Sequence, residues 1–326
     1  MGKNKRKIGL LVSATNKAPF LRKVLINLNY LIFHFDEREY IVNKNSASNN
    51  VYYVIRPQSE NVGLMASYFF VLRKTQEAIN KGYIPIVDFQ NFKCQYNVEV
   101  AINGTTNAWE YYFKQPAGLG VEVLNAESKI IYSGWSWFKE EKSLVLDEKI
   151  EANEELKRLA MERLSLNDII KDQVRKKYSE LLSGKITLGV FIRGTDYVAL
   201  RPKGHNIQPT IEAFIDKIKE FLNNYDINQI YIVTEDFDYF QRITEEIDCP
   251  VVMSDNDFVK DYNETDYVSA SINTDGFTRG MNYLTRLLLL TKCQYIVSSY
   301  AAGSIYSKMI REENPRDEYW FDLGKY

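Results

Sequence analysis

The sequence predicts an α/β protein built from two doubly wound, Rossmann-like domains that face each other across a cleft. Three observations support this prediction. The chain has 326 residues, more than one hydrophobic core usually organises. Short β-branched and aromatic runs alternate with longer segments of helical spacing, which is typical of βαβ units and parallel sheets. The alternation restarts after Gly184, so we place the first domain at 1–183 and the second at 184–326.

The first half contains one clear βαβ unit. Residues 51–56 (VYYVIR) form a β-branched and aromatic run closed by Pro57, which predicts a strand. A stretch of helical spacing follows from 63 to 78, and residues 83–87 (YIPIV) predict a second buried strand. The crossover implies that the two strands are parallel. Further elements are expected in this half: a short aromatic helix at 107–113, a strand at 130–132 and a charged helical bridge between the halves at 151–182.

The second half repeats the same alternation. The predicted strands are short and strongly apolar, and they lie at 186–192, 229–233, 250–253 and 294–297. The predicted helices run from Pro209-Thr210 to about 223 and over 238–247, 283–292 and 305–312. This half therefore predicts a doubly wound domain whose ligand lies at the carboxyl ends of the strands.

The composition excludes several classes of function. A formal net charge of −2 provides no global basic field for a nucleic acid. Three widely spaced cysteines without a CxxC pair indicate neither a disulfide framework nor a zinc site, and they favour a reducing compartment. Two histidines are too few for a histidine-rich metal centre. The sequence also lacks a Walker lysine motif and a GxGxxG after a strand, which removes the usual ATPase and NAD hypotheses.

The N-terminus is basic at 3–7 and then carries apolar stretches at 8–12 and 24–35. The second stretch contains Asn27, Asn29 and His34, and no run reaches about 18 apolar residues. We therefore expect neither a signal peptide nor a transmembrane span, and we expect a cytoplasmic protein. A surface helix is the simpler interpretation of this segment. A basic amphipathic element on the inner face of the membrane is the alternative.

Three strands of the second half end in polar clusters. The first cluster is Arg193-Gly194-Thr195-Asp196-Tyr197, the second is Thr234-Glu235-Asp236, and the third spans 298–304 (SSYAAGS). Because the carboxyl ends of parallel strands meet at one edge, the clusters are expected to converge there. A permanently charged planar guanidinium matches phosphate oxygens, and a helix N-terminus after the third cluster favours a pyrophosphate. The convergence predicts a site for a nucleoside diphosphate.

Each cluster also has a purely structural interpretation. Arg193 is able to form a salt bridge with Asp196, while the clusters at 234–236 and 298–304 are both suited to helix capping. The spacings at 236–238 and 255–257 match the D-x-D pattern of metal-dependent glycosyltransferases. Helix capping and turn formation explain both of these D-x-D segments, so we expect no metal.

The motifs resemble those of a known superfamily. GVFIRGTDY (189–197) with the following KGH (203–205) and QP (208–209), IYIVTED (230–236) and CQYIVSSYAAGS (293–304) resemble the three motifs of the fucosyltransferase superfamily. That superfamily includes α-1,6- and α-1,2-fucosyltransferases, the nodulation fucosyltransferase and protein O-fucosyltransferases. KGYIPIVDFQN (81–91) and NAWEYYF (107–113) resemble the N-terminal half of bacterial members found with polysaccharide biosynthesis. The resemblance covers residues 51–310.

The resemblance implies a GT-B fold and an inverting, metal-independent transfer, usually from GDP-fucose, with no cofactor. It implies that Arg193 binds the donor diphosphate and helps the leaving group to depart. The expected donor site combines the motif residues with their neighbours in the three clusters: Arg193, Gly194, Thr195, Tyr197, Thr234, Glu235, Asp236, Ser298, Ser299, Ala302, Gly303 and Ser304.

Two departures from the superfamily pattern affect the mechanism. Many members carry a histidine two places before the motif arginine, where this chain has Phe191. The α-1,6 enzymes have a glutamate base shortly after the motif aspartate, whereas residues 198–201 read VALR. The general base therefore does not carry over from the resemblance. Asp196 is our first candidate for it and His205 our second, although a role in stabilising the loop is equally open for His205.

The partners are expected to be a nucleotide sugar and a glycan or lipid-linked oligosaccharide, the latter held by the first half. The candidate residues on the acceptor side are Asp88, Asn91, Trp109 and Tyr111, and Trp109 is also suited to a core position. Two other functions stay open: a glycosyltransferase of the same fold that uses GDP-mannose or a UDP-sugar, and a non-catalytic protein that binds a nucleotide or a glycan.

Overall fold

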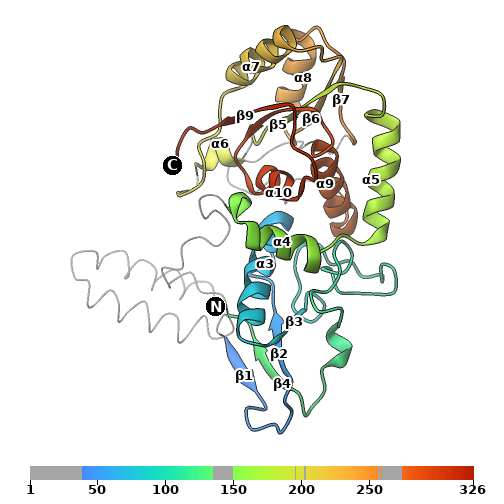
Figure 1. Ribbon diagram of the computed structural model, residues 1–326, viewed down its shortest axis with the longest axis vertical. Coiled ribbons are helices and arrows are strands. Elements are labelled where there is room, and N and C mark those ends of the chain that lie inside the picture. The colour runs from blue at the N-terminus through green and yellow to red at the C-terminus, as the bar shows by residue number, and fades with distance from the viewer. Residues whose placement is uncertain (1–38, 135–149, 195, 202, 256–257, 259–273) are drawn as a thin grey trace, which may run out of the picture.

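The computed structural model describes residues 39–134, 150–194, 196–201, 203–255, 258 and 274–326 (Figure 1). The basic N-terminal segment discussed for membrane contact lies outside these residues. Within the described part of the chain, no helix is both long enough and apolar enough to cross a membrane. Two β-sheets, one in each half of the sequence, form the framework of the molecule.

The N-terminal half contains a four-stranded sheet in the order β1-β4-β2-β3. Its strands are β1 (Tyr40–Val42), β2 (Val51–Ile55), β3 (Ile84–Val87) and β4 (Lys129–Tyr132). β2 pairs in parallel with β3 and β4, while β1 is antiparallel to β4. Helix α3 (Leu64–Asn80) crosses from β2 to β3 and ends before Gly82, whose φ of 71° suits the terminating turn. The βαβ unit predicted from the sequence is confirmed.

The C-terminal half contains a five-stranded parallel sheet in the order β7-β6-β5-β8-β9. Its strands are β5 (Thr187–Phe191), β6 (Gln229–Val233), β7 (Val251–Val252), β8 (Tyr295–Ser299) and β9 (Asp317–Phe321). Every residue of β5, β6 and β8 is buried, because helices cover both faces of the sheet. The continuous apolar runs seen in the sequence are the consequence of this double burial.

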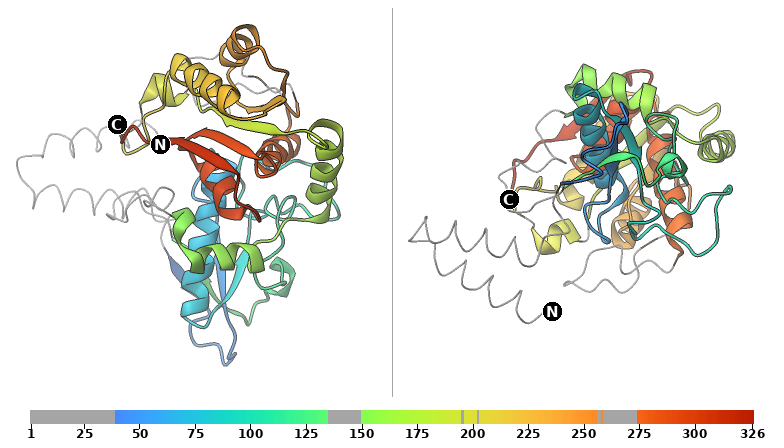
Figure 2. Two further views of the ribbon diagram at one scale, coloured as in Figure 1. Left: turned by 45° about the horizontal axis from the view of Figure 1, so that its top comes forward. Right: turned by 90° about the horizontal axis from the view of Figure 1, so that it is seen from below.

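Four helices cover the C-terminal sheet. α7 (Ile211–Asn224) and α8 (Phe237–Glu246) pack on one face, and α9 (Gly276–Leu290) and α10 (Ala302–Ile310) pack on the other. Figures 1 and 2 show α10 between this sheet and the N-terminal half, where it lies against α3 and α4 (Glu154–Arg163). Strand alternation directs the even-numbered side chains of β5 and β6, such as Val190 and Ile232, to the α7 and α8 face, together with Tyr295 and Val297 of β8.

The strand order reverses once in each parallel sheet. In the C-terminal sheet the chain passes outward from β5 to β6 and β7, then returns to place β8 on the other side of β5. In the N-terminal sheet the corresponding reversal lies between β2 and β4. Ligands of doubly wound proteins bind outside the carboxyl ends of the strands at such reversals. The topology therefore marks two positions, β5/β8 and β2/β4.

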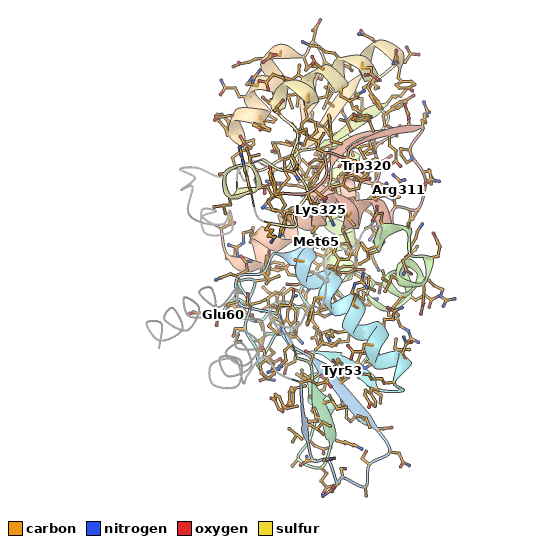
Figure 3. All side chains as sticks on the ribbon, turned by 90° about the vertical axis from the view of Figure 1, so that its left-hand side faces the viewer. Tyr53, Glu60, Met65, Arg311, Trp320 and Lys325 are labelled. Atoms are coloured by element: carbon orange, nitrogen blue, oxygen red, sulfur yellow. The ribbon has the colours of Figure 1, made fainter. Side chains whose placement is uncertain are left out.

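The two halves share one continuous hydrophobic core. Tyr68 on α3 contacts Tyr306 on α10 edge to face, with ring centroids 4.8 Å apart. Tyr112 donates from its hydroxyl to the carbonyls of Gly276 and Phe277, at 3.0 and 3.1 Å. Met65, labelled in Figure 3 at the N-terminal end of α3, belongs to the same core. We propose that 183/184, between α5 (Asp168–Leu181) and β5, divides two domains that pack closely along this side.

The structure differs from the expected elements in three places. Residues 107–113 form consecutive turns instead of a helix, because the Asn107 side chain bonds Phe89 N at 3.1 Å and Val87 O at 2.7 Å. The expected bridge is two helices, α4 and α5, since residues 165–167 pair with the end of these turns. α9 begins at Gly276 and not at the predicted residue 283. Asp275 caps this earlier start by accepting a hydrogen bond from Thr278 N.

Two glycines let α9 approach the N-terminal half. A Cβ on Gly276 would lie 2.6 Å from the Gln95 carbonyl oxygen, and a Cβ on Gly280 would lie 2.3 Å from Tyr112 Oη. Such distances are far below ordinary van der Waals contact. The spacing of four residues puts both glycines on one face of the helix. This face is where α9 meets the N-terminal half.

Replacing Gly280 with alanine is expected to lower the free energy of unfolding by about 1–3 kcal/mol, because Tyr112 must move from its buried position. Gly63→Ala is the matched control, since a Cβ there meets nothing within 4 Å and φ is −64°. Urea unfolding of both variants measures the difference. Equal stabilities for the two variants would contradict the close packing of α9.

Candidate active site

Residues from all three predicted clusters meet at the carboxyl edge of the C-terminal sheet. Arg193 follows β5 and forms an ion pair with Glu235, which follows β6. The backbone N–H of Arg193 donates to Ser299 Oγ, at the end of β8, at 3.4 Å. The two charged side chains are 18% and 10% exposed, so the pair is largely removed from water. The site lies at the β5/β8 reversal of the strand order.

The guanidinium of Arg193 also lies against the aromatic ring of Tyr197. Its guanidinium carbon lies 4.9 Å from the centroid of Tyr197, a cation–π distance. The Tyr197 hydroxyl is 3.1 Å from His205 Nδ1, and the two rings are edge to face. His205, our second candidate base, therefore lies in the same contact network as Arg193. The C-terminal residues hold its loop, since Tyr326 N donates to His205 O at 3.0 Å.

The second cluster divides its side chains between two tasks. Asp236 accepts from Tyr239 N at 3.2 Å and caps α8, and Thr234 Oγ1 accepts from Asp236 N at 3.1 Å. These contacts match the capping interpretation raised from the sequence. Glu235 forms the ion pair with Arg193. A Cβ on Gly194 would lie 2.7 Å from Asp236 Oδ2, so glycine allows the first two clusters to touch.

The hydroxyls of the third cluster are fully buried and bond to the backbone. Ser304 Oγ donates to Ser299 O at 2.7 Å and accepts from Ala301 N at 3.0 Å, while Ser298 Oγ donates to Ser299 O at 3.0 Å. Gly303 permits close packing, since a Cβ there would lie 2.3 Å from Tyr283 Oη. These serines shape the turn. The turn leads into α10, which begins at Ala302, and the backbone N–H groups of a first helical turn have no partner within the helix.

The first cluster also contains Thr195 and Asp196. Thr195 lies outside the described residues. Asp196, our first candidate base, is described only as the first residue of α6 (Asp196–Leu200).

The residues expected on the acceptor side occupy different environments. Buried Asp88 accepts from Asn91 N at 2.8 Å and from Asn91 Nδ2 at 2.9 Å, and Asn91 is exposed. Trp109 and Tyr111 are 1% and 0% exposed. Trp109 Nε1 donates to Lys114 O at 3.1 Å. The expectation that Trp109 and Tyr111 face an acceptor is not met, because both rings fill the core of the N-terminal half.

A buried ion pair that the sequence analysis did not predict supports the second cluster. Arg286 on α9 donates through Nε to Asp255 Oδ2 at 2.8 Å and forms a second bond to Oδ1. Its third nitrogen donates to Thr234 O at 3.4 Å. Burial lowers the pKa of Arg286 to about 10, so the guanidinium is still charged at neutral pH. The carboxylate of Asp255 is thus engaged by an arginine.

A loop of the N-terminal half reaches the same region. Tyr96 Oη accepts from Leu64 N, at the start of α3, at 2.9 Å. Arg279 donates to Gln95 O at 2.9 Å and stacks on the Tyr96 ring at 5.4 Å. Burial raises the pKa of Tyr96 to about 12, and both Arg279 and Arg193 oppose that rise. The loop that carries Gln95 and Tyr96 is thus held against α9 and against the start of α3.

Arg286→Met is expected to lower the free energy of unfolding by about 3 kcal/mol, because it removes the bidentate partner of a largely buried carboxylate. The double variant Arg286→Met/Asp255→Asn should recover most of that loss. Denaturant unfolding of the single and double variants provides the comparison. A double variant as unstable as the single one would show that the ion pair is not the source of the effect.

Comparison with known proteins shows similarity at the level of structure. No protein-family model matches the sequence, and no curated protein matches it. The selenomethionine crystal structure of the fucosyltransferase NodZ from Bradyrhizobium is 13% identical with a TM-score of 0.51, covering 85% of this chain and 96% of NodZ. A second NodZ structure gives 13% identity and a TM-score of 0.50, covering 81% and 93%. The apo form of POFUT1 gives 12% identity and a TM-score of 0.48, covering 84% and 99%.

The likeness to NodZ concerns the fold. It extends over 85% of this chain and 96% of NodZ. The α/β fold expected from the resemblance to the fucosyltransferase superfamily is thereby confirmed.

Proposed function

We propose that the protein is an inverting, metal-independent glycosyltransferase that transfers fucose from GDP-fucose to a hydroxyl of a glycan. The observation that carries this proposal is the convergence of three strand-end clusters on Arg193 at the β5/β8 reversal. The fucosyl donor is inferred from the three motifs and from the fold shared with NodZ, which is a fucosyltransferase. A glycan or lipid-linked oligosaccharide of cell-surface polysaccharide biosynthesis is the proposed acceptor, used in the cytoplasm or at the inner face of the membrane.

The donor diphosphate is proposed to lie between Arg193 and the start of α10. The guanidinium supplies parallel N–H donors to phosphate oxygens. The nine-residue helix α10 adds backbone N–H groups and the positive end of its dipole. Both features occupy the same edge of the sheet, since the backbone of Arg193 is bonded to Ser299, three residues before α10.

Glu235 is proposed to position Arg193. A guanidinium presents its five N–H donors in a rigid planar fork, so an ion pair with Glu235 fixes the orientation of that fork. The Tyr197 ring fixes the plane of the guanidinium from one side. With its partner and its plane both set, the cation needs little rearrangement when a donor arrives, and such preorganisation lowers the barrier.

The proposed reaction breaks the bond between the fucose C1 atom and the diphosphate oxygen, and the bonding electrons leave on the diphosphate. Arg193 stabilises that growing charge more strongly in the transition state than in the bound donor. The acceptor oxygen forms the new bond from the opposite face of C1, which inverts its configuration. Its proton passes to a side chain base, for which Asp196 is the first candidate and His205 the second.

Arg193→Ala is expected to slow the release of GDP from GDP-fucose by about 100- to 1,000-fold while the protein stays folded. Arg193→Lys should not restore the rate, because an ammonium lacks the planar fork. Arg242→Ala on α8 is the matched control, since it removes an exposed arginine that pairs with Glu212 and Glu246 on the surface. Normal turnover in Arg193→Ala, checked beside its thermal melting curve, would refute the site.

Calorimetric titration with GDP, UDP and dTDP is expected to show tightest binding for GDP, and EDTA should leave turnover of GDP-fucose unchanged. Phe191 keeps a second donor class open, because a buried phenylalanine stands where many superfamily members have a histidine. Tighter binding of UDP would favour a UDP-sugar, and turnover of GDP-mannose alone would favour that donor. GDP binding without turnover of any nucleotide sugar would indicate a non-catalytic binding protein.

A further inference from the structure

The reversal of strand order in the N-terminal sheet, between β2 and β4, carries a second group of side chains. Arg56 follows β2 and Ser133 follows β4. The backbone N–H of Arg56 donates to Ser133 Oγ at 2.9 Å, and its guanidinium donates to Ser133 O at 2.9 and 2.6 Å. Arg56 thus joins the carboxyl ends of two parallel strands at the place where doubly wound sheets bind ligands.

Two aromatic rings lie against the Arg56 guanidinium, and a third ring packs against both of them. Its central carbon lies 5.1 Å from the Tyr40 centroid and 5.3 Å from the Phe92 centroid. Tyr132 stacks on Tyr40 at 4.7 Å and meets Phe92 edge to face at 5.7 Å. We call Tyr40, Arg56, Phe92 and Tyr132 the Arg56 aromatic cluster. The rings come from β1, β4 and the loop after β3, and the cation fixes their mutual arrangement.

The cluster is held rigidly but is not sealed from solvent. Tyr40 is 36% exposed, and Phe92 and Tyr132 are each partly exposed. Exposed Asn91 precedes Phe92, and its amide is fixed by a hydrogen bond to buried Asp88. Aromatic faces cover the C–H faces of sugar rings, and an amide bonds to their hydroxyls. Partly exposed, preorganised rings beside such an amide therefore suit a saccharide.

A second nucleotide fits this place less well. A phosphate here would need the backbone N–H groups at the start of α3, the helix that follows β2. The N–H of Leu64 already donates to Tyr96 Oη at 2.9 Å. The connection from β2 begins Arg56-Pro57, and Pro57 has no N–H to offer a phosphate. The first N–H of α3 is therefore already engaged, and the cluster itself provides stacking surfaces.

One loop connects the cluster to the C-terminal half. Phe92 belongs to the cluster, and the backbone carbonyl of Gln95, three residues later, accepts from Arg279 of α9 at 2.9 Å. Three residues of extended chain span at most about 11 Å, so the cluster lies near α9. The same helix carries Arg286, which donates to Thr234 O in the second cluster of the candidate site at 3.4 Å. We propose that the Arg56 aromatic cluster binds the oligosaccharide acceptor and directs its reactive end toward Arg193. This inference rests on the proposed glycosyltransferase function.

A glycan array of bacterial surface oligosaccharides tests the inference without any donor. The wild-type protein is expected to bind at least one oligosaccharide. Tyr40→Ala and Phe92→Ala should each weaken that binding about tenfold, because each removes one stacking ring. Tyr178→Ala is the matched control, since Tyr178 on α5 is also 36% exposed but is remote from the cluster in sequence and sheet. Arg193→Ala should bind the oligosaccharide as the wild type does.

GDP binding, measured on the same proteins by calorimetry, separates the two proposals. Tyr40→Ala and Phe92→Ala should bind GDP as tightly as the wild type, which also shows that they are folded. A wild type that binds no oligosaccharide, or cluster variants that bind as the wild type does, would overturn the acceptor site. A wild type that binds oligosaccharide through the cluster but no nucleotide would sustain the saccharide site and refute the proposed donor.

Discussion

A guanidinium at the end of a fully buried strand must be neutralised and held, and this requirement organises the candidate site. Arg193 is neutralised by Glu235, which follows the neighbouring strand β6, and its guanidinium is held against the Tyr197 ring. A second guanidinium, Arg286 on α9, pairs with Asp255, which follows β7, and also donates to Thr234 O after β6. Each arginine has its own carboxylate, so the two pairs fix the ends of β5, β6 and β7 relative to one another. Parallel pairing brings the clusters to one edge, and these ion pairs neutralise the charges that meet there.

Much of the fold and part of this site follow from local sequence. Strands that are buried on both faces appear as continuous apolar runs, so β5, β6 and β8 are visible as TLGVF, QIYIV and YIVSS. Parallel pairing then brings whatever follows each strand to one edge. That geometric consequence is enough to place Arg193, Glu235 and Ser299 together. It does not identify the ion-pair partner of each charged side chain, because the sequence also allowed Arg193 to pair with Asp196.

The remainder depended on tertiary contacts that no local pattern contains. Trp109 and Tyr111 resemble ligand-binding aromatic residues in the sequence, but both side chains are buried in the hydrophobic core. Thr234 and Asp236 lie beside Glu235, yet Asp236 caps α8 and the Thr234 hydroxyl accepts from the backbone N–H of Asp236. The buried ion pair of Arg286 does have a signal in the sequence. A single arginine within the leucine run of α9, Arg286, indicates a buried charge that requires a partner.

The glycine face of α9 has a consequence for motion. Tyr112 and the loop at Gln95 contact the start of α9 so closely that separating the halves there would break buried hydrogen bonds. A rotation of the halves around this contact disturbs these hydrogen bonds far less than a translation that separates the halves. α9 is therefore expected to serve as a fixed pivot, about which the carboxyl edges of the two sheets swing toward or away from each other. Substrates would then be gripped by a small angular closure and not by the docking of separate bodies.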